Sequence, residues 1–497
     1  QGLEIDPSHP NSWAKLGQIY RIHEDYEQSV AAYEQAIKLD PTYAWAHNGH
    51  GLALKALGRT REAIMSFKRA ARYQPKAVMH WYSLTEMLVD LGQYQDALEY
   101  AKEAVRVAAQ HAPSWAKFGQ ILRHLKQLDE SLDAYNRAIA LDPASTWAIN
   151  GKGIVLEQME RYDEALDCYR ESARLKPDDL WHWYNQGNVF VLMERYDEAL
   201  AALERALEID PKHARSWARL GNTLRHLNRL EDALDACQKA VDYEPLQPWT
   251  WNEFGITLES MGRHAEALDA YTHAVEISAD EPFYTFKQTD LLAYMGQHEK
   301  ACALLEQALK GEPNNSHLWA KYGQVLRRLN RHAEALNAYN RAIDLDIYND
   351  WAWAGRGLAL SALRRHDDAL YSFDRAIDLK NNDVWYWYNR AEELNALNRP
   401  EDALASLDTA LAINSRHPES HAKRGQTLRR LGRLEESLEA FDLAVSLNPR
   451  SGWAWNGRGL TLRELGRREE AVASYERAAR EEPKNVWYVI NQIDILL

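Results

Sequence analysis

A short segment of this chain recurs at intervals of 102 residues. Residues 12–15 read SWAK, residues 114–117 repeat those four letters, and 216–219, 318–321 and 420–423 carry SWAR, LWAK and SHAK. A fixed internal period is the signature of repeat architectures, in which each unit packs on its neighbours. The period therefore constrains the fold more strongly than any local propensity does.

Each 102-residue block contains three copies of a shorter, 34-residue unit. Numbered from Pro10 as position 1, position 20 is Ala or Ser in all fourteen complete copies, and position 27 is Ala in all except Ser172. Position 8 is Gly in eleven copies, with Thr85, Thr289 and Ala391 as the exceptions. Because this frame holds without an insertion or deletion, we expect one continuous stack of equivalent units.

Each unit has the pattern of two amphipathic helices. In the first copy, Trp13, Leu16 and Tyr20 follow spacings of three and four residues, which places them on one helical face. A Gly-Arg or Asn-Arg pair then marks a short turn, as at residues 58–59. The second helix ends at proline, as at Pro41, because the ring removes a donor and disfavours helix in the preceding residue. The pattern predicts an all-α solenoid of helical hairpins.

These residues resemble the tetratricopeptide repeat family, whose pattern is W-x2-L-G-x2-Y, then A-x3-F, then P. The first copy matches that pattern through Trp13, Leu16, Gly17, Tyr20, Ser29, Tyr33 and Pro41. The resemblance implies a right-handed superhelical solenoid whose concave groove is lined by the first helices and binds protein segments, and it implies no reaction. The copy beginning at 282 matches most weakly, with Thr285, Gln288 and Thr289 in place of Trp, Leu and Gly.

The repeat frame also sets the expected domain organisation. Residues 1–9 are interpreted as the tail of a preceding repeat, and 10–485 as fourteen tandem repeats in three-repeat blocks. Residues 486–497 are interpreted as the first helix of a further, incomplete repeat. Because this last helix is strongly apolar, we expect it to contact a further repeat or another copy of the chain.

Composition excludes several classes of partner. A net charge of −14 argues against a general binder of nucleic acid or acidic lipid. No apolar run approaches the roughly 18 residues that a membrane span needs. The three cysteines form no C-x-x-C motif, so neither a zinc site nor a disulfide framework is predicted. A reducing compartment, the cytoplasm, is the expected location.

No motif predicts catalysis or a cofactor. Gly-x-Gly triplets, such as residues 151–153, resemble fragments of a phosphate loop, but they fall inside first helices and follow no strand. His298 and Cys302 lie one helical turn apart without a second pair of ligands, which makes a poor metal site. We therefore predict a chain that is not an enzyme and that carries no cofactor and no metal.

A second face of the first helix, carrying positions 2, 5, 9 and 12, is predicted to line the groove. Along the chain this face alternates arginine and amide, then tryptophan and asparagine, then tyrosine and carboxylate. Such side chains suit carboxylates and peptide backbone, so we expect the ligand to be an extended protein or peptide segment of acidic or amide character. The candidate partner-binding residues are Arg21, Arg123, Arg225, Arg327 and Arg429; Gln120, Asn222 and Gln324; Asn150 and Asn252; Tyr82, Tyr184 and Tyr388; and Glu86, Asp290 and Glu392.

Alternatives remain open at this stage. The arginines could instead pair with the acids of neighbouring repeats, since surface pairs of this kind are common and contribute little. The position-2 tryptophans, from Trp45 to Trp453, are interpreted as structural. At the level of function, a protein-interaction scaffold is the leading hypothesis. A regulatory arm of a larger enzyme and a structural protein assembling head to tail into a fibre are the alternatives.

Overall fold

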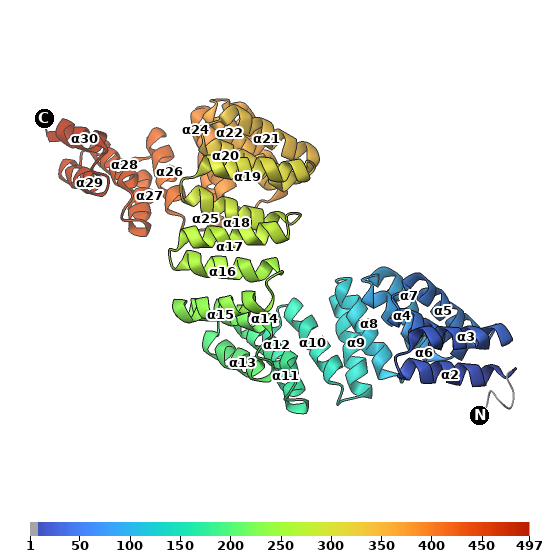
Figure 1. The fold of residues 1–497 in the computed structure, drawn as a ribbon. Helices are drawn as coiled ribbons and strands as arrows, with labels where there is room; N and C mark the ends of the chain where they lie inside the picture. The colour runs from blue at the N-terminus through green and yellow to red at the C-terminus, as the bar shows by residue number, and fades with distance from the viewer. Residues whose placement is uncertain (1–7, 497) are drawn as a thin grey trace. The chain divides into compact units, whose positions relative to one another are not determined.

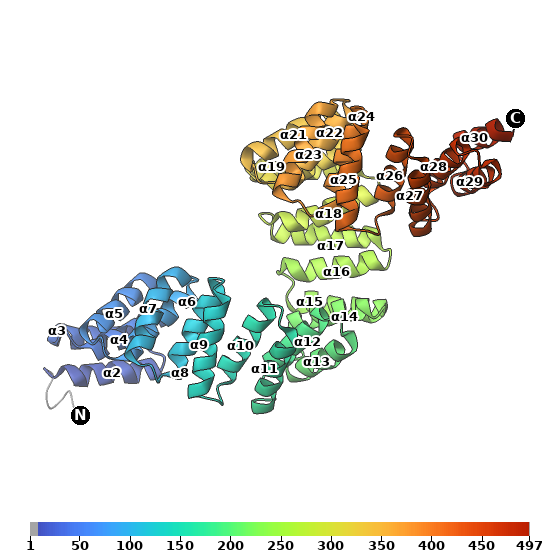
Figure 2. The same cartoon turned by 180° about the vertical axis from the view of Figure 1, so that it is seen from behind.

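The computed structural model describes residues 8–496, so most of the expected preceding-repeat tail (1–7) and Leu497 lie outside the described residues. Throughout 8–496 the chain forms helical hairpins and no strand. It divides into two compact units, residues 1–245 with 256–261 and residues 246–255 with 262–497. Within each unit the hairpins follow one another in chain order (Figures 1 and 2).

The first helix of each hairpin begins at position 1 of the 34-residue unit, as the periodicity predicts. The first helices are α2 (Pro10–Ile22), α4 (Ala44–Ala56), α6 (Val78–Asp90), α8 (Ala112–His124), α10 (Thr146–Gln158), α12 (Leu180–Leu192), α14 (Ala214–His226), α16 (Pro248–Ser260), α18 (Pro282–Tyr294), α20 (Ser316–Arg328), α22 (Asp350–Ala362), α24 (Val384–Ala396), α26 (Pro418–Arg430), α28 (Gly452–Glu464) and α30 (Val486–Leu496).

The second helices occupy positions 17 to 30 of the unit. They are α3 (Tyr26–Leu39), α5 (Thr60–Tyr73), α7 (Tyr94–Val107), α9 (Leu128–Leu141), α11 (Tyr162–Leu175), α13 (Tyr196–Ile209), α15 (Leu230–Tyr243), α17 (His264–Ile277), α19 (His298–Gly311), α21 (His332–Leu345), α23 (His366–Leu379), α25 (Pro400–Ile413), α27 (Leu434–Leu447) and α29 (Arg468–Glu481). The prediction of an all-α solenoid of hairpins is confirmed.

The turn inside each hairpin depends on one left-handed residue at position 15. In the second hairpin Gly58 has φ +72°, its N–H donates to Lys55 O (3.0 Å), and the N–H of Arg59 donates to Leu54 O (2.9 Å). This pair of bonds satisfies two carbonyls that the end of α4 would leave unpaired. Position 15 has positive φ throughout, at Gly58, Gly92, Gly262, Gly296, Gly432 and Gly466, and also at Glu24, Lys126, Glu160, Glu194, Asn228, Asn330, Arg364 and Asn398.

The Gly-x-Gly triplets are packing sites for aromatic rings. Tyr33 on α3 is buried between Gly17 of its own hairpin and Gly49 of the next, where an added Cβ would lie 2.9 Å and 2.3 Å from the ring. A Cβ at Gly51 would lie 2.6 Å from Phe67. Since side chains cannot approach so closely, Gly17, Gly49 and Gly51 are required for these hairpins to stack around the two rings.

Where tryptophan stands at position 4, its indole can connect the hairpin to the turn before it. The indole Nε1–H of Trp319 on α20 donates to the carbonyl of Pro313, six residues earlier, at 2.9 Å. His47 and His421 place Nε2 in the same way, each 2.9 Å from a carbonyl. The same indole bond is made by Trp81, Trp115, Trp183, Trp217, Trp353, Trp387 and Trp455. The tryptophan of the repeat pattern therefore satisfies a backbone acceptor between hairpins, besides filling space.

Candidate partner-binding face

The first helices present a continuous surface within each unit. Consecutive first helices contact one another directly, as in the series α2, α4, α6, α8 and in the series α18, α20, α22, α24. In the described part of the chain, consecutive second helices make no comparable contact; a second helix such as α3 instead packs against the first helices α2 and α4 on either side of it. We call the surface formed by positions 2, 5, 6, 9 and 12 of these helices the first-helix face.

The acidic side chains of this face pair with lysines that the sequence analysis did not select. Lys321 Nζ lies 2.6 Å from Asp290 Oδ1, and Lys423 Nζ lies 2.7 Å from Glu392 Oε1. Lys117 Nζ approaches Glu86 Oε1 at 3.9 Å. These lysines stand at position 6, and each reaches the carboxylate at position 9 of the preceding hairpin.

Each of these lysines also lies between two aromatic rings. Lys117 Nζ is 4.9 Å from the ring centroid of Trp147 in the following hairpin and 5.9 Å from that of Tyr82 in the preceding one. Lys321 and Lys423 repeat the arrangement with Trp351 and Phe286, and with Trp453 and Tyr388. Burial lowers the pKa of Lys117, while Glu86 opposes that shift. We call this cation with its carboxylate and two rings a lysine staple; it spans three hairpins.

The arginines at position 12 have different neighbours. The guanidinium groups of Arg21, Arg123 and Arg327 lie against the hydroxyl groups of Tyr33, Tyr135 and Tyr339. Burial raises the pKa of Tyr135 to about 12, and Arg123 opposes this increase.

The five arginines also differ in the partners of their guanidinium groups. Within residues 8–496 no carboxylate pairs with Arg21, Arg123 or Arg327, and their Nε atoms are buried without a partner. Arg429, in contrast, donates to Glu464 at 2.6 Å, and Arg225 donates to Thr257 at 3.4 Å.

Two exposed aromatic triads occupy equivalent places, one in each unit. Trp181 is 44 % exposed and contacts His213 (centroids 5.1 Å apart) and Tyr184 (5.9 Å). Trp385, 52 % exposed, contacts His417 at 4.7 Å and Tyr388 at 5.6 Å. The histidines are fixed by hydrogen bonds between Nδ1 and a serine hydroxyl. Each tryptophan precedes a predicted tyrosine by three residues on the same helix, and this spacing is the sequence signal that could have revealed it.

The amides and the remaining position-5 residues are less accessible. Asn252 is buried, and Asn150 accepts a hydrogen bond of 3.0 Å from Asn185 of the next hairpin. Gln120, Asn222 and Gln324 are half-buried. The side-chain oxygens of Gln120 and Asn222 are buried and have no hydrogen-bond partner among the described residues.

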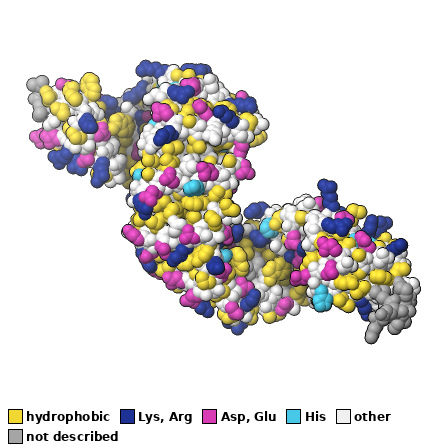
Figure 3. All heavy atoms as spheres, in the orientation of Figure 1, with side chains coloured by type: hydrophobic (Ala, Val, Ile, Leu, Met, Phe, Trp, Pro, Cys, Tyr) yellow, Lys and Arg dark blue, Asp and Glu magenta, His cyan; other side chains and the backbone are white. Residues whose placement is uncertain are grey.

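The wider surface has no single-sign patch on the face in view. Hydrophobic, basic and acidic side chains are interspersed there (Figure 3). In the described residues no helix has the length and apolarity of a membrane span. No group of three or more His, Cys, Asp or Glu side chains within 8–496 is arranged to hold a metal ion.

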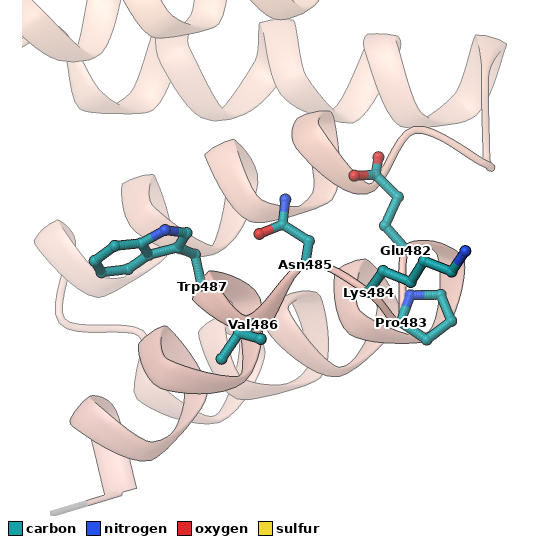
Figure 4. A pocket seen from close by; sticks show the side chains of 6 residues that line it. All are labelled: Glu482, Pro483, Lys484, Asn485, Val486 and Trp487. Carbon is teal, nitrogen blue, oxygen red and sulfur yellow. The ribbon is translucent and has the colours of Figure 1, made fainter.

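A separate open hollow of about 690 Å³ lies at the turn between α29 and α30 (Figure 4). It is lined by residues 482–487. On α30 itself Val486, Trp487, Val489 and Ile493 are 65, 70, 41 and 49 % exposed. These side chains give α30 an uncovered apolar surface.

Paired helices of fixed length, stacked through small residues and joined by left-handed turns, define a solenoid of helical hairpins. A family model described as the tetratricopeptide repeat matches residues 48–114, 87–146, 184–248, 286–350 and 388–452. Further models of the same repeat match residues 17–58, 144–212, 250–281 and 452–485. The chain belongs to the tetratricopeptide repeat family.

Comparisons with individual proteins are more distant. Anaphase-promoting complex subunit 3 of Schizosaccharomyces pombe is 29 % identical over 82 residues, and the match spans 16 % of this chain and 12 % of that protein. The APC/C hetero-tetramer Cut9–Hcn1 is similar at 13 % identity and a TM-score of 0.41, covering 91 % of this chain and 96 % of the other. Yeast Tom70 is similar at 15 % identity and a TM-score of 0.43, covering 85 % and 96 %.

Proposed function

We propose that this chain is a non-catalytic protein-interaction scaffold whose first-helix face binds an extended polypeptide segment with acidic or amide side chains. The observation that carries the proposal is an imbalance of charge pairing on that face. The acids pair with lysines, whereas Arg21, Arg123 and Arg327 have no carboxylate partner in the described residues. A guanidinium offers two parallel donors to a carboxylate, so a ligand acid would complete the pairing.

The exposed aromatic triads would provide apolar contacts for the same polypeptide ligand. Trp181 and Trp385 are held edge-on by a tyrosine and a histidine although about half of each side chain is exposed. A large aromatic ring that is already ordered loses little conformational entropy on binding, and such residues dominate interface energetics.

The test is selection from an unbiased peptide display library with the full chain as bait, followed by measured Kd values for the selected peptides. We expect the selected sequences to be enriched in Asp and Glu. Arg123→Glu and Arg327→Glu should each weaken binding by about tenfold or more, because a hydrogen bond to a charged group contributes roughly 1.5–3 kcal/mol. Circular dichroism should show unchanged helix content.

The matched control is Arg205→Glu on the second helix α13. Arg205 is exposed and pairs with Glu208 on its own helix. Equal loss of affinity from this variant would place binding elsewhere, and selected peptides without acids would contradict the assigned ligand chemistry.

A second proposal concerns head-to-tail self-association through α30, and the apolar exposure of Trp487 and Ile493 favours it. Ile19 and Ile22 on α2 are also exposed, at 51 and 65 %, and could supply the complementary surface. Sedimentation velocity at increasing concentration should show association that Ile493→Lys reduces, because a charge cannot be buried there without cost. A wild-type chain that stays monomeric at all concentrations contradicts this second proposal.

A further inference from the structure

The hairpin α18–α19 lacks the tryptophan that ties its neighbours to the preceding turn. Thr285 stands at position 4 of this hairpin, where Trp319 stands in the next. Gly311 stands at position 30, which carries a large side chain such as Leu345 in the next hairpin. A Cβ added at Gly311 would meet no atom within 4 Å. Two large side chains are therefore missing from one place.

A cavity of about 320 Å³ lies at that place. Its lining includes Ala279 at the preceding turn, Thr285 on α18, and Leu304, Gln307 and Gly311 on α19. The lining residues belong to the second compact unit. None of them is part of the first-helix face, so the cavity is a separate feature of the molecule.

The lining positions are those that contact the position-4 ring in other hairpins. Position 23 does so where Trp81 stacks on Tyr100, with centroids 6.2 Å apart. Position 26 does so where Lys239 Nζ lies 4.4 Å from the ring centroid of Trp217. Leu304 and Gln307 are the residues at these two positions in the cavity.

Position 30 completes this correspondence. In the second hairpin the rings of His47 and Tyr73, at positions 4 and 30, have centroids 5.4 Å apart. Thr285 and Gly311 occupy the same two positions here. The cavity is thus the socket of an indole that this hairpin does not supply.

The socket also retains the hydrogen-bond acceptor. Ala279 is the counterpart of Pro313, whose carbonyl accepts the indole N–H of Trp319 at 2.9 Å. Among the residues that the structure describes, no backbone N–H outside the helices donates to the carbonyl of Ala279. A mainly apolar cavity with one unpaired carbonyl acceptor favours a ligand that is flat and apolar and carries one N–H donor.

We propose that this cavity is a docking site for a tryptophan side chain of a partner polypeptide. The ring fills the space between Leu304 and Gly311, and its Nε1–H donates to the Ala279 carbonyl. Asp280 and Glu312 also border the cavity, with their side chains at or near the surface. Their carboxylates accept hydrogen bonds from Ser278 and Asn315. The tryptophan of the partner is therefore flanked by lysine or arginine.

Saturation-transfer NMR on the full chain tests the socket, with N-acetyl-L-tryptophanamide as the probe. The wild type should bind the probe, and Thr285→Trp and Gly311→Leu should each abolish binding because they fill the cavity. Both variants should melt at or above the wild-type temperature, since they restore residues used by neighbouring hairpins. Thr42→Trp, which adds an exposed indole elsewhere, is the control and should bind normally.

A second arm tests the acceptor and the charge. N-acetyl-L-phenylalaninamide should bind roughly fivefold more weakly than the tryptophan amide, because it lacks the donor. A short peptide with tryptophan between lysines should bind more tightly than one with tryptophan between glutamates, and added salt should reduce the difference.

Three outcomes overturn the proposal. The first is a wild type that does not bind the tryptophan amide, and the second is binding that survives both cavity-filling variants. The third is a concentration-dependent dimer, seen by sedimentation, that both Thr285→Trp and Trp487→Ala abolish. That result would identify the occupant as a second copy of this chain, through its exposed Trp487.

Discussion

The Nε atom of Arg390 donates a hydrogen bond of 2.6 Å to Oδ1 of Asp374, which lies on the second helix of the preceding hairpin. Its Nη1 donates to Ser406 Oγ on its own second helix, also at 2.6 Å. Arg458 makes the same pair of bonds, to Asp442 and Ser474. An arginine at position 7 therefore connects three helices at each of these junctions.

We expect Arg390→Met to lower the free energy of unfolding by about 0.5–1 kcal/mol, because the pair is only partly exposed and fixed by a second bond. The effect should shrink at high salt, where charges are screened. Urea unfolding at two salt concentrations measures it. Arg399→Met is the control: its pair with Asp402 lies within one hairpin and is more exposed, so the change should be smaller. Equal effects would contradict a special role for the inter-hairpin bond.

The left-handed turns predict a stabilising substitution. Glu160 has φ +60° at position 15, where other hairpins have glycine. Because the left-handed region costs a residue with a Cβ roughly 1 kcal/mol, Glu160→Gly should stabilise the hairpin α10–α11 by up to that amount. Hydrogen exchange of the amides in this hairpin reports the change. Asn228→Gly should do less, since asparagine tolerates this conformation, and a destabilised Glu160→Gly variant would refute the explanation.

The hydrogen bond from the position-4 indole to the preceding turn predicts that replacing the tryptophan lowers the free energy of unfolding. Trp319→Phe retains most of the ring but loses the 2.9 Å bond to Pro313 O, so stability should fall by about 1–2 kcal/mol. Chemical denaturation measures the loss. Trp385→Phe, at an exposed ring outside position 4, should cost less than about 0.5 kcal/mol. If the two variants behaved alike, the hydrogen bond would have no measurable role.

His50 predicts a loss of stability in mild acid. Burial lowers the pKa of His50 from 6.5 to about 4, with smaller contributions from His47 and Arg59. As the pH falls from 6.5 towards 4, the unfolded chain binds a proton at His50 and the folded chain does not. The stabilising contribution of neutral His50 to the free energy of unfolding is therefore fully present above pH 6.5 and is lost between pH 6.5 and 4. The loss should amount to roughly 2–3 kcal/mol.

Thermal scans at several pH values test this expectation. In the wild type, His50 Nδ1 lies 2.9 Å from the hydroxyl of Ser66, and the glutamine of His50→Gln can keep a hydrogen bond to that hydroxyl. The melting temperature of this variant should depend less on pH than that of the wild type. His23→Gln, at an exposed turn residue, is the control and should leave the dependence unchanged. The same slope in wild type and His50→Gln would contradict the prediction.

Much of the fold followed from the sequence because the period is unbroken. Helix starts, the turn at residues 58–59 and the weak copy beginning at 282 could be read from spacing alone. The reason for glycine at positions 6 and 8 could not, because it depends on the ring of Tyr33, which reaches into the next hairpin. The sequence alone argued against a phosphate loop at the Gly-x-Gly triplets, but it did not explain why the glycines are there.

The candidate site was predictable only in part. Spacings of three and four residues from positions 2 and 9 lead equally well to position 5 and to position 6, and the sequence analysis followed position 5. The lysines at position 6 were missed for that reason, although Lys117, Lys321 and Lys423 recur in the 102-residue frame. The cavity beside Thr285 could not be predicted from the sequence, because Thr285 and Gly311 are 26 residues apart and only the packing of the helices brings them together.

The lysine staples determine how such a chain can change its length. If residues 384–417 alone were deleted, Lys423 would face Leu358 in place of Glu392 and would keep no carboxylate. If the 102 residues 316–417 were deleted instead, Lys423 would meet Asp290 and Phe286, which are equivalent to the residues it lost. Duplication or deletion can thus preserve every pairing only in steps of three hairpins, which makes the 102-residue block the unit of growth for this protein and for any engineered longer or shorter form.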